Sequence, residues 1–91
     1  VFVVDTTGGL AALSLTDQLR SAGFKTDRAW DNRSMKAQMK AADKSGALVA
    51  VIVGEEELAT DTVTLRDLRE STEQSEIKKE IIIETLRKRL R

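Results

Sequence analysis

The apolar segment at residues 47–53 places the strongest constraint on what this chain can fold into. It reads Ala-Leu-Val-Ala-Val-Ile-Val between Gly46 and Gly54, and no polar residue interrupts it. Such a run is typical of a strand buried on both faces, because a half-exposed strand alternates apolar and polar residues. The sequence therefore predicts a central strand in a sheet that is covered on both sides.

The segments before this strand predict two β-α units. Residues 1–4 form a second uninterrupted apolar run, and residues 24–30 alternate as a half-exposed strand nearer the sheet edge would. A helix is expected over residues 10–22, with Gly23 as its stop. Because helices connect the first three strands, we expect these strands to be parallel. The apolar face of the first helix comprises Ala12, Leu15, Leu19 and Ala22.

The segments after the central strand predict a reversal of direction. Residues 55–58 are expected to form only a short turn, so the alternating strand at residues 62–68 should run antiparallel, with Val63 and Leu65 pointing inward. A weaker edge strand is expected near residues 74–77. The chain should end in a helix whose apolar face comprises Ile77, Ile81, Ile82, Leu86 and Leu90.

The helix expected between Ser34 and Gly46 carries a line of basic residues. Ser34 is a favourable N-cap and Gly46 a favourable residue after a helix end. Lys36, Lys40 and Lys44 recur every four residues, Arg33 precedes them, and Asp43 softens their charge. This line is either a solvated face or a contact for nucleic-acid phosphates. The apolar face expected to pack inward comprises Met35, Met39 and Ala42.

Composition excludes several kinds of chemistry. The chain has 91 residues, 15 basic and 15 acidic side chains, and neither Cys nor His. Zinc sites of the usual type, thiol nucleophiles and imidazole catalysis are therefore excluded, and we expect no catalytic residue and no metal site.

No apolar run reaches membrane-spanning length, and the length suits one domain. The chain starts in strand-like sequence without Met, so we expect a piece of a longer protein.

Three other positions allow a functional and an ordinary interpretation. The segment at residues 5–9 could hold a phosphate, but it lacks the known nucleotide-binding spacings, and a tight turn is favoured. Among the adjacent acids at residues 55–57, solvation is the default, although a single Glu there could accept from a nucleobase amine. Arg66 could contact a base or a phosphate, or pair with an acid. Trp30 could stack on a base or pack internally.

Several of these segments together resemble one family. The chain is similar, over essentially all of its length, to the C-terminal anticodon-binding domain of bacterial histidyl-tRNA synthetases, which are class II enzymes. The most specific part runs from Lys36 through Gln38 and Lys40 to the Val-Gly-Glu turn that ends at Glu55. The segments that carry the resemblance are residues 31–47, 51–58 and 63–69 and the pair Glu73-Gln74.

The resemblance implies an α/β, three-layer fold with a mixed, mostly parallel five-stranded sheet and three helices. It implies that residues 1–91 form a single anticodon-binding domain that binds histidine-accepting tRNA and has no cofactor of its own. ATP and Mg²⁺ would act in a separate catalytic domain of a cytoplasmic, homodimeric parent, with no membrane partner. The expected tRNA contacts are Arg33, Ser34, Lys36 and Lys40, which would position the RNA backbone, and Glu57 and Arg66, which would read base edges.

Two other functions stay open at this level. The chain could be a protein-interaction or dimer-stabilising module that uses Ile82 and Ile83 if both do not fit inside. It could also be a receiver-like or small-nucleotide-binding α/β domain, which only the order of elements favours.

Overall fold

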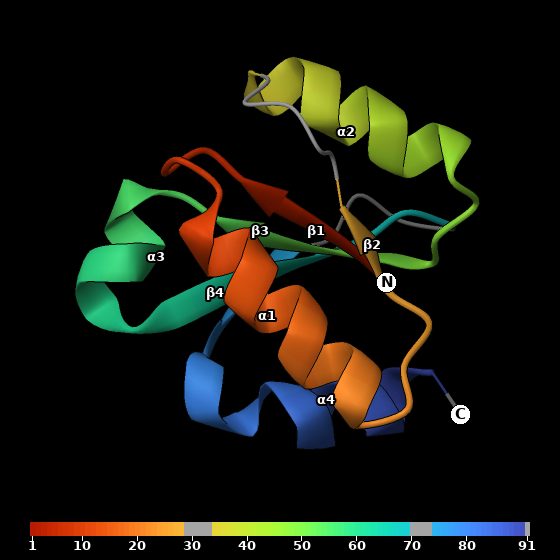
Figure 1. Cartoon of the computed structure of the whole chain (residues 1–91). Helices are drawn as coiled ribbons and strands as arrows, with labels where there is room; N and C mark the ends of the chain where they lie inside the picture. The colour runs from red at the N-terminus through yellow and green to blue at the C-terminus, as the bar shows by residue number, and fades with distance from the viewer. Residues whose placement is uncertain (29–33, 70–73, 91) are drawn as a thin grey trace.

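The fold has three layers around one sheet. The computed structural model describes residues 1–28, 34–69 and 74–90 of the 91-residue chain. A five-stranded sheet of order β2-β1-β3-β4-β5 lies between helix α2 on one side and helices α1 and α4 on the other (Figure 1). This is the mixed α/β architecture that the sequence predicts.

The elements follow one another as the hydrophobic pattern indicates, with one addition. The strands are β1 (Phe2–Asp5), β2 (Asp27–Arg28), β3 (Val49–Val53), β4 (Thr62–Asp67) and β5 (Gln74–Lys78). The helices are α1 (Leu10–Ser21), α2 (Met35–Lys44), α3 (Glu55–Thr60) and α4 (Ile82–Arg89), with a 3₁₀ turn at Lys79–Ile81. The three expected helices are present, and α3 is an additional short one.

The central position of β3 is confirmed. All five of its residues are buried, and it pairs with β1 in parallel and with β4 in antiparallel orientation. The weak edge strand also forms, because β5 pairs antiparallel with β4. The direction of the chain therefore reverses after β3, as predicted.

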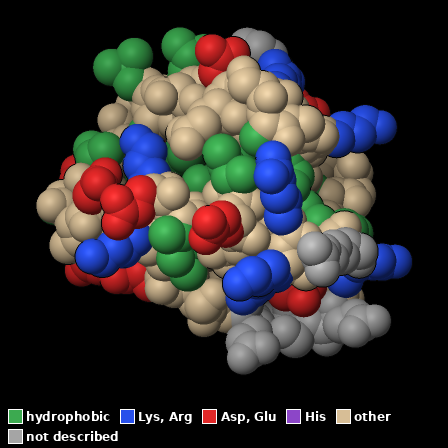
Figure 2. Space-filling view, turned by 90° about the horizontal axis from the view of Figure 1, so that it is seen from below, with side chains coloured by type: hydrophobic (Ala, Val, Ile, Leu, Met, Phe, Trp, Pro, Cys, Tyr) green, Lys and Arg blue, Asp and Glu red, His purple; other side chains and the backbone are tan. Residues whose placement is uncertain are grey.

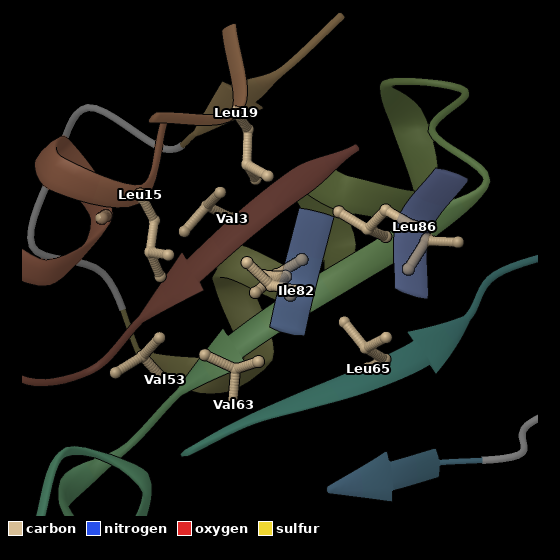
Figure 3. Packing of buried hydrophobic residues seen from close by; sticks show 11 residues of the cluster. Val3, Leu15, Leu19, Val53, Val63, Leu65, Ile82 and Leu86 are labelled. Atoms are coloured by element: carbon tan, nitrogen blue, oxygen red, sulfur yellow. The ribbon is translucent and has the colours of Figure 1, made fainter. Parts of the chain in front are cut away.

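The main core lies on the side of the sheet that α1 and α4 cover. The side chains of Val63 and Leu65 point into it and are fully buried, as the alternation of β4 predicts. Ile82 is fully buried and Ile83 is half-buried against the same core, so both contribute to the interior. Figure 3 labels the residues that meet there, which are Val3, Leu15, Leu19, Val53, Val63, Leu65, Ile82 and Leu86.

A smaller core lies on the α2 side. Ala42 and the half-buried Met39 pack there on Phe2 and Ala50. The expectation for Met35 is wrong, since its side chain is 38% exposed. The buried side of α2 instead includes a polar residue, Gln38, which is 3% exposed.

Three other boundaries differ from the sequence prediction. Residues 55–58 belong to helix α3 and not to a turn, and the three glutamates of its first turn favour the positive end of the helix dipole. Within residues 24–28, only Asp27–Arg28 forms a strand, although Lys25 and Asp27 also exchange backbone hydrogen bonds with Val1 at 3.0 Å each. Ile77 lies in β5 and Ile81 is 43% exposed, so the inward face of the last helix begins at Ile82.

Candidate nucleic-acid interface

A buried amide fixes the first turn of α2 to the end of β1. The Asp5 backbone N–H donates to Gln38 Oε1 at 2.9 Å, and Gln38 Nε2 donates to the Asp5 carbonyl at 2.8 Å. The described pairing between β1 and β2 ends at Val3, so Gln38 supplies the backbone partners for Asp5 on that side. One turn earlier, Ser34 Oγ accepts from the Ala37 N–H at 3.2 Å, which caps the helix as predicted.

The carboxylate of Asp5 organises the loop between β1 and α1. Its Oδ1 accepts from the backbone N–H of Thr7 at 2.6 Å and from the Thr7 hydroxyl, and its Oδ2 accepts from the Ala12 N–H at 2.9 Å. Burial alone would raise the pKa of Asp5, but the hydrogen bonds from Thr7, Ala12 and Gly9 outweigh it and hold the pKa below its ordinary value. This carboxylate is therefore occupied internally, and the short connection to α1 passes through Gly8 and Gly9, which both have positive φ.

The carboxylate of Glu57 lies over the end of β3. A Cβ atom placed on Gly54 would be 3.4 Å from Glu57 Oε1 and 3.6 Å from Thr6 Oγ1. Thr6 is held beside β3 by a hydrogen bond from its N–H to the Val53 carbonyl at 3.1 Å. Ala50, Ile52 and Gly54 alternate on the α2 side of the strand, so the Glu57 carboxylate lies on that side.

The same side of the sheet is open over β4 and β5. Arg66 pairs with Ala50 on one side and with Gln74 on the other, and Thr64 pairs with Glu76. We call Thr64, Arg66, Gln74 and Glu76 the β4–β5 strip. Helix α2 packs mainly on β1, so Gln74 and Glu76 are exposed and Arg66 is half-buried. Among the described residues, no hydrogen bond or ion pair engages the Arg66 guanidinium.

The two predicted base-reading residues share a face but not a position along it. Arg66 pairs with Ala50, whereas Glu57 lies over Gly54 beyond Val53. At the usual rise of about 3.3 Å per residue, the step from Ala50 to Val53 alone is roughly 10 Å. The structure therefore presents Glu57 and Arg66 as two separate contact points on one surface.

The predicted backbone contacts divide into two groups. Ser34 lies at the end of α2 that faces the carboxyl ends of β1 and β3, the edge that also carries Glu57. Lys36 and Lys40 are exposed and lie two positions before and after Gln38, about 200° around the helix, so they point away from the sheet. Arg33 and Trp30 lie outside the described residues.

Two helices begin at this edge with opposite charge. The first turn of α2 contains no acidic residue and includes Lys36, whereas the first turn of α3 contains three glutamates. Within the described residues, the partial positive charge of the helix N-terminus therefore meets no acidic side chain in the first turn of α2, whereas three glutamates meet it at α3. A phosphate would favour the first end, and a base amine would favour Glu57 at the second.

Two residues that hold this edge together, Gln38 and Asp5, are not predicted to do so by the sequence pattern. The apolar pattern of α2 gives Gln38 no role, although a glutamine beside the inward Met39 is a signal for a buried amide. Asp5 was interpreted only as part of a turn, and its charge proves to cap the start of α1. Neither residue is exposed enough to contact RNA directly.

The face of the molecule that carries α1 and α4 has a mixed distribution of charge. Figure 2 views it from below, where Lys and Arg side chains alternate with Asp and Glu side chains over the surface and no broad area of one sign is visible. Within the described residues, no group of three or more His, Cys, Asp and Glu side chains is arranged to hold a metal ion. None of the helices over residues 1–28, 34–69 and 74–90 is long and apolar enough to cross a membrane.

Comparison with known sequences points to one family. The family model described as "Anticodon binding domain" matches residues 1–89. A histidine–tRNA ligase from Pelotomaculum thermopropionicum is 46% identical over 79 residues, which are 87% of this chain and 18% of that protein. A histidine–tRNA ligase from Solidesulfovibrio magneticus is 38% identical over 88 residues, or 97% of this chain and 21% of that protein. The chain thus spans about a fifth of the length of these relatives.

Solved structures give the same picture. The histidyl-tRNA synthetase from Nostoc sp. PCC 7120 superposes with a TM-score of 0.85 at 32% identity, covering 99% of this chain and 22% of that one. The RNA binding domain of threonyl-tRNA synthetase from Cryptosporidium parvum superposes with a TM-score of 0.83 at 17% identity, covering 96% of this chain and 22% of that chain. The second likeness shows the fold alone.

Proposed function

This chain belongs to the anticodon-binding domain family, and on that basis we propose that it recognises the anticodon loop of a histidine-accepting tRNA. The observation that carries the proposal is that Glu57, Arg66 and the start of α2 all lie on the one sheet face that no second helix covers. The names of the relatives favour histidine as the amino acid.

We propose that residues 1–91 are one domain of a longer histidine–tRNA ligase. The relatives are about five times as long as the segment they share with this chain, which leaves room for a catalytic domain. That domain would use ATP and Mg²⁺ to attach histidine to the tRNA, and this chain would contribute no chemistry. We further propose that the parent is a homodimer that acts in protein synthesis in the cytoplasm.

The spacing of the two base-reading residues suits a short run of nucleotides. Stacked bases repeat at about 3.4 Å along a strand, so three of them cover roughly 10 Å. The Arg66 and Glu57 positions, at Ala50 and Gly54, lie roughly 13 Å apart along β3, a distance that about four base steps would span. The donors of Arg66 suit the O6 and N7 acceptors of guanine, and the carboxylate of Glu57 suits a base amine.

Backbone contacts would come from the α2 end. In this proposal Arg33 and Ser34 hold phosphates near the start of the helix, and Lys36 and Lys40 meet the RNA where it passes over the outer side of α2. Phosphate contacts of this kind position the RNA without selecting its sequence. Sequence choice would then rest with Glu57 and Arg66.

A binding titration tests the proposal. The 91-residue chain is titrated with a fluorescent anticodon stem-loop of histidine tRNA and, as control, with the same stem-loop carrying other bases at the anticodon. If about three phosphates are neutralised, the log-log salt slope is roughly −2, at ~0.7 per phosphate on a single strand. Equal affinity for both loops, or binding that ignores salt, would contradict the assignment.

The full-length ligase offers a second readout. Arg66→Ala should raise the KM for tRNA while histidine activation by ATP, measured by pyrophosphate exchange without tRNA, stays unchanged. That split is expected because an anticodon contact acts on tRNA binding and not on the activation step. Unchanged tRNA kinetics would remove Arg66 from the interface.

A further inference from the structure

Gln74 lies directly across from Arg66 on the open sheet face. We propose that Gln74 is a further specificity-determining residue, which reads the same base as Arg66 or the base next to it. The inference rests on the proposed RNA-binding function. It starts from the antiparallel register, which pairs Arg66 with Gln74 at the end of the β4–β5 strip.

The register brings the two side chains within reach of one base. Directly opposed residues of an antiparallel pair have Cβ atoms about 4.5–5.5 Å apart and project from the same face. Gln74 is exposed and Arg66 is half-buried, so both can meet a ligand from the open side. In the described part of the chain, no hydrogen bond joins the Gln74 amide to Arg66 or to any other group.

Contacts on the opposite face of β5 fix the position of Gln74. On that face, Arg89 Nη2 donates to Ser75 Oγ at 3.0 Å, and Ile77 packs against the main core. These contacts tie the strand to α4 and to the interior. A one-residue slip of β5 would expose Ile77, so the register that points Gln74 toward the open face is well determined.

The amide supplies what the other candidate residues lack. Arg66 can only donate hydrogen bonds, and the Glu57 carboxylate can only accept them. The Gln74 side chain can do both, which suits the mixed donor and acceptor edge of an unstacked RNA base. Of the rest of the β4–β5 strip, Thr64 is short and half-buried, and Glu76 carries a negative charge that opposes RNA.

The test compares Gln74→Ala with wild type on a panel of stem-loops in which each anticodon base is replaced in turn. We expect a roughly 5- to 100-fold loss of affinity for the cognate loop, the fold-change that one bidentate base contact supports, and a loss of discrimination at one anticodon position only. Gln74→Glu keeps the size of the side chain but loses the amide donor, so it should lose the same discrimination. Thermal melts confirm that both variants are folded.

Glu76→Gln is the matched control, because it lies on the same strand and the same face two residues further on. It should change affinity for all loops by a similar factor and leave discrimination intact. If the wild-type chain discriminates and Gln74→Ala discriminates equally well, the inference is overturned and the proposed function stands. If the wild-type chain neither binds nor discriminates, the proposed function fails, and this inference fails with it.

Discussion

The two faces of the sheet differ in burial and in polarity. One face is covered by α1 and α4 and carries the main apolar core, whereas α2 covers the other face over β1 and β3 and leaves the β4–β5 strip polar and open. Strand β4 contributes to both, since Leu65 is fully buried on the first face and Arg66 projects from the second. Adjacent residues of one strand thus lie on the covered and the open face, and the proposed function assigns stability to the first and recognition to the second.

The largest effect should follow from Leu65→Ala on the covered face. Removing a fully buried leucine leaves a cavity, and the expected loss of unfolding free energy is about 2–5 kcal/mol. Urea denaturation followed by circular dichroism measures it. A loss below about 1 kcal/mol would mean that this face is not the close-packed one.

Asp5→Asn should lower stability by about 1–3 kcal/mol at neutral pH, because the charged acceptor for Thr7 and Ala12 is lost. The folded-state pKa of Asp5 is depressed, so its stabilisation is complete above the ordinary carboxyl pKa and is lost as the pH falls through the lower folded value. Wild-type unfolding free energy should therefore fall more steeply than that of Asp5→Asn between about pH 5 and pH 2. Parallel pH profiles would contradict this role for Asp5.

Arg66→Ala should weaken RNA binding and leave stability nearly unchanged, whereas Leu65→Ala should lower stability. The affinity for the cognate stem-loop is expected to fall by about 1–3 kcal/mol, while unfolding free energy changes by less than about 0.5 kcal/mol, as for most surface substitutions. Arg66→Lys keeps the charge but loses the planar guanidinium group. Compared with Arg66→Ala, it should therefore bind all loops more tightly but still fail to discriminate between them. Strong destabilisation by Arg66→Ala would end the separation between the two faces.

The smallest effects are expected on the outer side of α2. Lys36→Ala and Lys40→Ala should each reduce the magnitude of the salt slope by about 0.7 and weaken binding to every loop by a similar factor. Lys44→Ala removes the same charge at the other end of the helix and should leave the slope unchanged. A change in sequence discrimination in either of the first two variants would show that these lysines do more than position the backbone.

The sequence predicts most of the fold because its apolar runs are unambiguous. The central strand, the inward pair Val63 and Leu65 and the antiparallel return all follow from periodicity. The sequence does not predict helix α3, because Glu55, Glu56 and Glu57 have no apolar periodicity and their stabilising interaction is with the helix dipole.

The candidate site was harder to predict than the fold. The outward position of Arg66 can be inferred from the alternation of apolar and polar residues along β4. The role of Gln38 cannot, because its partners are backbone groups of Asp5, 33 residues away, and the pattern instead favours Met35 as an inward residue. That Lys36 and Lys40 point away from the sheet follows only once Gln38 is known to be buried.

Amide chemical-shift mapping tests the central claim most directly. The ¹⁵N-labelled chain is titrated with the histidine anticodon stem-loop, and shifts are followed along the sequence. The account predicts that the shifts concentrate at the start of α2, around Gly54 and Glu57, and along the β4–β5 strip, while α1 and α4 stay unchanged. Shifts concentrated on α1 and α4 would place the RNA on the covered face and contradict the account.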